Sequence, residues 1–261
     1  MASTEQEQNA RAWDALAKHQ AGLATPASDA DFRNPLQAVD PRGWLGESIA
    51  GSKVLCLAAG GGRQSALYAA AGAQVTVVDI SGEMLALDRQ VAAARSLAIR
   101  AIQASMDALP MLADDEFDVV IQPVSTCYVA DVGPVFREVA RVTRPGGLYI
   151  SQHKTPTSLQ TEIRPAGEGY RLSEPYYREG PLPAAPPCRT REPGTLEFLH
   201  RWEELIGGIC RAGFSVEDLV EPLHAKPQAA VGTFGHRSGF VAPYVRVKAR
   251  RIDVGSKNLI L

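Results

Sequence analysis

Three consecutive glycines, Gly60 to Gly62, follow the apolar run VLCLAA and precede an alanine-rich stretch that is typical of a helix. Because glycine has no Cβ, such a turn lets a ligand approach the backbone amides at the start of a helix. A second apolar run, VTVVD, ends in Asp79, whose carboxylate can accept hydrogen bonds from both hydroxyls of a ribose. We therefore expect a ligand that contains adenosine.

These features alone do not choose between cofactors, because a strand-end acid also follows the glycines in dinucleotide-binding folds. The turn reads GGGRQS, so Ser65 stands where the third glycine of G-x-G-x-x-G would be. That glycine permits close packing of helix and strand in pyrophosphate-binding folds. Its replacement weakens the dinucleotide interpretation. The structural alternative is that the glycines only form a tight turn and Asp79 only caps the next helix.

The elements that must position these residues alternate along the chain. Short β-branched runs indicate five strands, near 53–58, 74–79, 99–104, 116–121 and 147–152. Between them, amphipathic stretches indicate helices at 63–71, 82–96 and 131–142. The stretch GTLEFLHRWEELIGGICRAGF predicts another helix, and two more strands follow near 214–220 and 239–249. This alternation predicts an α/β fold with a doubly wound, mostly parallel sheet and helices on both faces.

Residues 155–195 break the alternation. They hold eight of the eighteen prolines and three of the seven tyrosines, with five arginines between them: Arg164, Arg171, Arg178, Arg189 and Arg191. A segment of this length without long regular elements is usually functional or disordered. Its aromatic content favours a cap that follows the fifth strand and covers a substrate.

Composition limits the partners. A net charge of -2 gives no general attraction to nucleic acid or to an anionic membrane, so small-molecule chemistry is favoured. The four cysteines lack metal-ligand spacing, and we expect no metal. The polar N-terminal residues and the absence of a long apolar run lead us to expect a cytoplasmic protein. Nothing indicates the oligomeric state.

Two further motifs narrow the cofactor. DDEFDVVIQPVSTCYV places a Phe-Asp pair at the start of the fourth strand, and FREVARVTRPGGLYIS joins a helix, a Pro-Gly-Gly stop and the fifth strand. With these motifs, residues 40–250 resemble the class I S-adenosylmethionine-dependent methyltransferases, particularly the branch that acts on small molecules. The resemblance implies a seven-stranded sheet whose last strand is antiparallel. It also implies S-adenosyl-L-methionine as cofactor and S-adenosyl-L-homocysteine as product.

The resemblance divides the chain into a helical N-terminal lead-in (1–50), a methyltransferase domain (51–250) with its cap insertion (155–195), and a C-terminal tail (251–261). It also implies cofactor contacts in four segments. These are Ala58, Ala59, Gly60 and Gly62 around the methionine part, Asp79 on the ribose, Ile80 and Met84 beside the adenine, Ser105 and Met106 at its amino group, and Gln122 and Pro123 at the amino-acid end. The sequence departs from the family pattern at Cys56, where an acid is usual, at Ala58, where glycine is usual, and at Ser105, where many relatives carry Asp.

Methyl transfer from a sulfonium is an in-line displacement, so a general base is needed only when the acceptor must lose a proton. His153 is the first candidate base, because imidazole titrates near neutral pH and this residue ends a strand; His200 is the second. Candidate acceptor contacts are Tyr128, Tyr170, Tyr176, Tyr177, His224 and His236. The sequence lacks N-P-P-Y after the fourth strand, a motif that in the resembling family accompanies amino groups of nucleobases and glutamine, so the resemblance disfavours nucleic-acid and protein-amide acceptors. The five arginines of the cap suggest an acceptor with a carboxylate or phosphate.

Two other functions stay open at this point. One is a nicotinamide-dependent oxidoreductase on a doubly wound sheet. The other is a non-catalytic module that binds S-adenosylmethionine as a sensor. Binding of the two kinds of nucleotide separates the first from a methyltransferase, and turnover separates the second.

Overall fold

The computed structural model describes residues 3–19, 24–184 and 188–253. Its centre is a seven-stranded sheet in the order β3-β2-β1-β4-β5-β7-β6. The strands are β1 (Lys53–Leu57), β2 (Gln74–Asp79), β3 (Ile99–Gln103), β4 (Phe117–Gln122), β5 (Thr143–Lys154), β6 (Phe214–Val220) and β7 (Tyr244–Arg251). Strands β1 to β5 pair in parallel, whereas β7 lies antiparallel to both β5 and β6. The mostly parallel sheet with an antiparallel last strand confirms the prediction.

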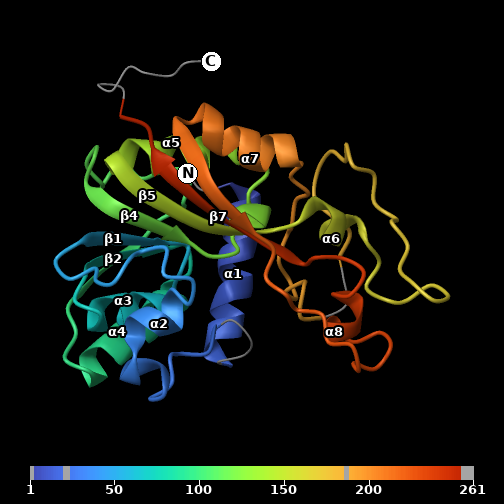
Figure 1. Cartoon of the computed structure of the whole chain (residues 1–261), viewed down its shortest axis with the longest axis horizontal. Helices are drawn as coiled ribbons and strands as arrows, with labels where there is room; N and C mark the ends of the chain where they lie inside the picture. The colour runs from blue at the N-terminus through green and yellow to red at the C-terminus, as the bar shows by residue number, and fades with distance from the viewer. Residues whose placement is uncertain (1–2, 20–23, 185–187, 254–261) are drawn as a thin grey trace.

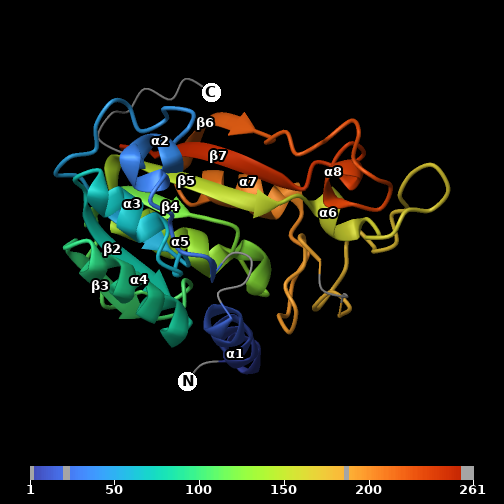
Figure 2. The same ribbon diagram turned by 90° about the horizontal axis from the view of Figure 1, so that it is seen from below.

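Helices cover both faces of the sheet (Figures 1 and 2). The α-helices are α1 (Thr4–Lys18), α2 (Pro35–Val39), α3 (Gln64–Ala70), α4 (Gly82–Ala94), α5 (Gly133–Val142), α6 (Pro156–Gln160), α7 (Trp202–Arg211) and α8 (Phe234–Arg237), and the short 3-10 helices are η2 (Asp31–Arg33) and η3 (Thr126–Tyr128). Apolar side chains of α2, α3 and α4 pack on one face of β1 and β2. Those of α5 and α7 pack on the other face.

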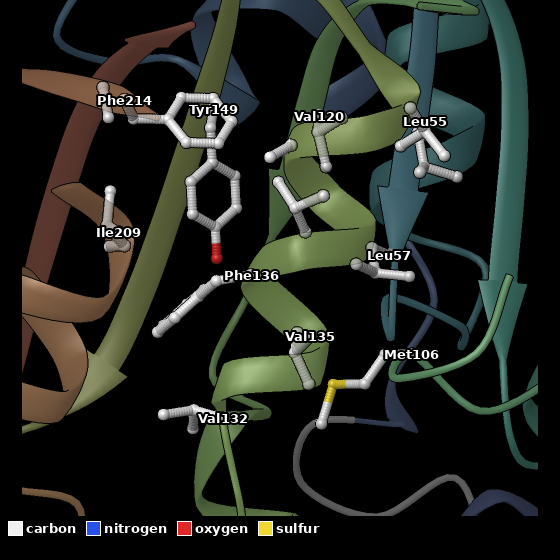
Figure 3. Close-up of a cluster of buried hydrophobic side chains, with 14 of the residues drawn as sticks. Leu55, Leu57, Met106, Val120, Val132, Val135, Phe136, Tyr149, Ile209 and Phe214 are labelled. Atoms are coloured by element: carbon white, nitrogen blue, oxygen red, sulfur yellow. The ribbon is translucent and has the colours of Figure 1, made fainter. Parts of the chain in front are cut away.

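The larger core lies beneath α5 and α7. Tyr149 of β5 is fully buried, and its ring lies between Phe214 of β6 and Phe136 of α5 (Figure 3), with ring centroids 5.5 and 6.4 Å away. Burying aromatic rings of this size contributes about 2–3 kcal/mol each. This core fixes which face of β5 points away from solvent.

Strand order reverses beside β1, which pairs with β2 on one side and β4 on the other. The register aligns Leu57 with Val78 and Cys56 with Ile121. The segments that follow these three strands therefore leave the sheet at one edge. In an open α/β sheet this edge is where ligands bind.

Three element boundaries differ from the prediction. The RPGG stretch does not separate α5 from a strand at 147: β5 begins at Thr143, and the pairing with β4 jumps from Thr143 to Leu148 across a bulge. The last strand begins at Tyr244 rather than near 239, directly after Pro243, which lacks the N–H that a ladder needs. Helix α7 begins only at Trp202, because the backbone before it pairs with other segments: Phe198 N donates to Cys127 O and Glu197 O accepts the amide of Leu182.

The predicted lead-in contains α1, which begins with a capping box between Ser3 and Gln6. Asn9 ties this helix to the domain: its Nδ2 donates to the carbonyl oxygens of Tyr128 (2.9 Å) and Leu196 (3.2 Å). Its Oδ1 accepts the amide of Leu196 at 2.7 Å. The helix therefore joins the loop after β4 to the end of the predicted cap.

The predicted cap, residues 155–195, contains α6 and three isolated bridges in its described part. Figures 1 and 2 show this yellow-to-orange segment extending beyond the end of β5, beside α8. No helix of the described residues is long and apolar enough to cross a bilayer. Residues 254–261, most of the predicted tail, lie outside the described residues.

Candidate active site

A cavity of about 930 Å³ lies at the carboxyl edge of the sheet. Its wall includes residues of α1, the glycine turn, the segments after β2, β3 and β4, the end of the cap, and the segment around α8 and β7. Ligand sites of drug-sized molecules have volumes of roughly 300–1,000 Å³. One continuous space thus connects the glycine turn with the cap.

Asp79 and the glycine turn form one end of this cavity. The carboxylate of Asp79 accepts the amide of Gly60 at 2.9 Å through Oδ2 and the amide of Ser81 at 2.9 Å through Oδ1. Burial raises the pKa of Asp79, and these amide hydrogen bonds oppose the shift. A Cβ at Gly60 would lie 2.8 Å from Met84 Cβ and 3.0 Å from Asp79 Oδ2. Glycine is therefore required for the turn to lie against the acid.

A second buried carboxylate holds the turn from behind. Asp88 of α4 accepts the amides of Gly61 (3.0 Å) and Gly62 (3.1 Å) and the hydroxyl of Ser65. Gly62 has φ +73°, and a Cβ there would lie 2.8 Å from Val91 Cγ2. Gly62 does not line the cavity. Our prediction that it allows close approach of the cofactor is therefore wrong, because it faces α4 instead.

Ala58 directly follows β1 with a left-handed backbone, φ 48°, and lines the cavity. This conformation costs about 1–2 kcal/mol for a residue with a Cβ. The amide of Ala58 donates to Val78 O at 2.8 Å, which keeps the turn tied to β2. The position that is usually glycine in the resembling family therefore keeps the glycine conformation although it is alanine here.

The segment after β3 meets α1. Ser105 and Met106 line the cavity, and Gln6 Nε2 donates to Ser105 Oγ at 3.0 Å and to Asp107 Oδ2 at 3.0 Å. Ile80 and Met84 line the same end. The cavity therefore has an end with two apolar side chains and a polar edge made of side chains from two segments.

Most of the predicted cofactor residues come together. Nine of them line the cavity: Ala58, Ala59, Gly60, Asp79, Ile80, Met84, Ser105, Met106 and Pro123. Gln122 does not line it. Its buried amide donates to Ser125 Oγ at 2.9 Å and accepts the Tyr149 hydroxyl at 2.5 Å. It therefore supports the loop after β4 from within the core.

Helix α1 contributes a wall of the cavity that was not predicted from the sequence. Gln6, Asn9, Trp13 and Leu16 line the cavity, and Trp13 meets Tyr128 edge to face with centroids 5.6 Å apart. These four positions are three or four residues apart, the spacing of one helix face. That spacing was the signal available in the sequence.

A buried ion cluster lies at the other end of the cavity. Lys154 Nζ lies 2.8 Å from Glu192 Oε2 and 3.3 Å from Glu197 Oε1, and Arg191 pairs with Glu197 at 2.8 Å. Burial disfavours the ammonium, but the nearby acidic groups together raise the pKa of Lys154 above its usual range. Tyr128 donates its hydroxyl to Glu192 at 2.5 Å. Tyr128 and Glu192 both line the cavity.

The two predicted bases lie elsewhere. His153 is fully buried, and its ring nitrogens contact Thr126 Oγ1 at 2.9 Å and Ser151 Oγ at 2.8 Å. Burial lowers its pKa to about 3, with a smaller effect of His200. The Nε2 of His200 contacts the carbonyl oxygens of Thr126 and Val129. Neither histidine lines the cavity, so the expectation that they face the acceptor is wrong.

The three cap tyrosines also lie away from the cavity wall. Tyr170 contacts His236 Nδ1 at 2.9 Å, Tyr176 accepts the amide of Trp202 at 3.4 Å, and Tyr177 is 75% exposed. His236 packs with Tyr170 rather than lining the cavity. The structure therefore does not bring these four predicted contacts to the cavity, since the tyrosines pack against α7 and α8 or face solvent.

Of the predicted acceptor contacts, Tyr128 and His224 line the cavity. The end of the cap reaches it through other residues, namely Cys188, Arg189, Glu192 and Pro193. No composition signal distinguishes these positions from the rest of the cap. No group of three or more possible metal-ligating side chains is found among the described residues.

The sheet order, the antiparallel last strand and a cavity at the switch point beside β1 define a class I methyltransferase fold. Comparisons with known proteins agree. Residues 55–151 match the family described as a methyltransferase domain, Methyltransf_11. The chain is 39% identical over 185 residues to the uncharacterized methyltransferase YbaJ of Bacillus subtilis, covering 69% of this chain and 72% of that protein.

The chain therefore belongs to the class I S-adenosylmethionine-dependent methyltransferases, and S-adenosylmethionine is its cofactor. It is 33% identical over 123 residues to a ubiquinone biosynthesis O-methyltransferase of Stutzerimonas stutzeri, covering 46% of this chain and 53% of that protein. A Mesorhizobium loti S-adenosylmethionine-dependent methyltransferase structure matches with a TM-score of 0.67 and 24% identity, covering 84% of this chain and 100% of that one. The Streptomyces coelicolor geranyl diphosphate C-methyltransferase structure matches with a TM-score of 0.63 and 15% identity, covering 96% and 99%. These structural likenesses concern the fold.

Proposed function

We propose that this enzyme methylates a small molecule held in the 930 Å³ cavity. The observation that carries the proposal is the continuity of this cavity. It joins the glycine turn and Asp79 at one end to Tyr128, Glu192 and His224 at the other. A cofactor and an acceptor that must react in line need one shared space of this kind. The name of the Stutzerimonas stutzeri relative, a ubiquinone biosynthesis O-methyltransferase, supports a small-molecule acceptor.

On the cofactor side, Asp79 is placed to accept hydrogen bonds from the ribose hydroxyls. Its two oxygens already accept one backbone amide each, so the carboxylate is fixed in orientation and keeps lone pairs for a ligand. Ile80 and Met84 offer apolar surface for the adenine, with Ser105 at its polar edge. Ala58, Ala59, Gly60 and Pro123 then border the amino-acid end.

Bound S-adenosylmethionine supplies an electrophilic methyl group on a sulfonium. The protein's own contribution is to hold the acceptor in line and to exclude water. Helix α1 contributes to the exclusion, because Trp13 and Tyr128 form an aromatic contact in the wall. Where the acceptor must lose a proton, Glu192 is the carboxylate at the acceptor end, positioned by Tyr128 and Lys154.

The test is calorimetric binding followed by turnover. We expect S-adenosylhomocysteine to bind and NAD and NADP not to bind. Labelled methyl groups should then pass to components of a small-molecule extract, and not to RNA or protein from the same cells. Binding of a nicotinamide nucleotide in place of S-adenosylhomocysteine would contradict the cofactor site. Label found mainly in RNA or protein would contradict the acceptor class, and binding without any transfer would favour a sensor.

A further inference from the structure

The rim of the acceptor end is formed by Arg189 and by three aromatic side chains, which we call the aromatic wall: His224, Phe234 and Tyr244. All four line the cavity. The Arg189 guanidinium carbon lies 4.7 Å from the Phe234 ring centroid. The His224 ring lies 5.4 Å from that of Phe234 and 5.5 Å from that of Tyr244, and the Tyr244 hydroxyl donates to Arg189 O at 3.4 Å. These contacts link the four residues in a closed circuit and hold Arg189 beside the cavity.

Arg189 differs from the charged side chains of the cavity wall that form ion pairs. Arg63 pairs with Asp31 at 2.8 Å, and Glu192 pairs with Lys154 at 2.8 Å. Within the described residues, the guanidinium of Arg189 contacts the Phe234 ring and forms no ion pair with a carboxylate. Arg189 is also exposed at the rim, so a ligand in the cavity can reach it. A guanidinium in this setting retains all five donors for an anion.

The charges around the acceptor end do not cancel. Four basic side chains face two carboxylates there, which leaves two positive charges: Lys154, Arg189, Arg191 and Arg246 against Glu192 and Glu197. Arg246 donates to Gln152 Oε1 at 2.7 Å, and Gln152 lines the cavity. Partial burial lowers the pKa of His224, and the charges of Arg189 and Arg246 lower it further. A neutral His224 then adds ring surface without a competing charge.

The five arginines of the predicted cap differ in their partners and in whether they line the cavity. Arg178 pairs with Glu174 at 2.7 Å and Arg191 with Glu197, and neither lines the cavity. Arg164 and Arg171 are exposed away from the cavity wall. Arg189 is therefore the member of this set whose charge is directed to the acceptor end.

We propose that the methyl acceptor carries a carboxylate or phosphate that binds at Arg189, with its apolar or ring portion against the aromatic wall. This assignment rests on the proposed function, because it names the substrate class of the same site. Arginine suits both anions, since its planar donors pair with two oxygens at once. The aromatic rings also fix the guanidinium plane, which reduces the entropy lost when an anion binds.

The experiment uses four small probes and the full chain saturated with S-adenosylhomocysteine. Benzoate and phenyl phosphate are titrated by ligand-detected NMR against their neutral counterparts, benzamide and phenol. We expect at least one anion to bind several times more tightly than its neutral counterpart. Arg189→Gln should weaken that anion roughly tenfold, the loss typical of a charge-assisted hydrogen-bond pair, and leave the neutral probes unchanged. The preferred probe tells a carboxylate from a phosphate.

Arg164→Gln is the matched control, because it removes the same charge outside the cavity wall. Arg189→Lys should keep part of the anion preference, as a point charge without the fork geometry. Equal binding of anionic and neutral probes, or an equal loss in Arg164→Gln and Arg189→Gln, would overturn the inference. The titrations are repeated without S-adenosylhomocysteine. Failure of that ligand to bind would contradict the proposed function, while the anion preference is still read directly.

Discussion

Ser65 donates its hydroxyl to the buried carboxylate of Asp88, the same carboxylate that accepts the amides of Gly61 and Gly62. Ser65, which interrupts the glycine pattern, is thus part of the hydrogen-bond network that holds the glycine turn. A third glycine at this position would leave Asp88 with one hydrogen bond fewer. The geometry explains why the turn is formed with a serine there.

This relationship predicts a pH dependence of stability. Burial raises the pKa of Asp88 to about 6, against the opposing hydrogen bonds of Ser65 and the two glycine amides. The folded protein then holds this proton more tightly than the unfolded chain, so stability falls as pH rises from about 4 to about 6. The contribution is on the order of 3 kcal/mol.

The measurement compares urea unfolding of the wild type and Asp88→Asn between pH 4 and 7. Other buried carboxyls, such as Asp79, titrate in both proteins, so the difference between the two curves isolates Asp88. We expect this difference to change with pH up to about 6 and to be constant above it. Two parallel curves across the whole range would show that Asp88 does not titrate there.

Asp79→Ala should weaken S-adenosylhomocysteine binding ten- to a hundred-fold. The reason is the loss of about 1.5–3 kcal/mol of hydrogen bonding to a charged group. Isothermal calorimetry gives the dissociation constant, and a thermal melt checks the fold. The exposed neighbour Glu83 provides the control Glu83→Ala, which should bind normally. An unchanged constant in folded Asp79→Ala would remove Asp79 from the site.

Glu192→Gln should lower turnover of a proton-losing acceptor by at least tenfold, within the range seen when a general base is removed. Its S-adenosylhomocysteine affinity should stay within about twofold, because Glu192 lies at the other end of the cavity. Glu174→Gln, in the same segment but outside the cavity wall, is the matched control. Equal rates for the two variants would rule out Glu192 as the base.

Asn9→Ala should lower the free energy of unfolding by about 2–3 kcal/mol, because it leaves polar backbone atoms of Tyr128 and Leu196 without partners. Ligand affinity should fall as well, since α1 forms one wall of the cavity. Gln8→Ala, one residue away, removes only a solvent-exposed hydrogen bond to Gly194 O and should cost less than about 0.5 kcal/mol. Denaturant unfolding and calorimetry measure both effects, and similar losses in the two variants would contradict the role of Asn9.

Local patterns in the sequence were sufficient to predict the sheet, the glycine turn and Asp79. Apolar runs, glycines and an acid at a strand end are local signals. Each indicates a strand, a turn or a strand terminus without reference to residues far away in the sequence. The carboxyl ends of parallel strands then meet at one edge by topology alone. For this reason most predicted cofactor residues do line one cavity.

Alternation along β5 could have corrected one error. Tyr149, Ser151 and His153 share one face because successive side chains point to opposite sides, and Tyr149 lies in the core. The same rule puts Gln152 on the other face, where it lines the cavity. Counting from the buried tyrosine would therefore have placed His153 in the core.

Tertiary structure alone decided the acceptor end. Glu192 meets Lys154 across 38 residues, and Asn9 meets Leu196 across 187. Such contacts follow from how irregular segments pack on a finished sheet, and no period or motif encodes them. The end of the cap contacts helix α1 on one side, through Gly194, and the segment around α8 on the other, through Arg189. The sequence by itself determined that the glycine turn and Asp79 meet, because both lie at strand ends, whereas long-range packing alone brought Tyr128, Glu192 and His224 to the same cavity.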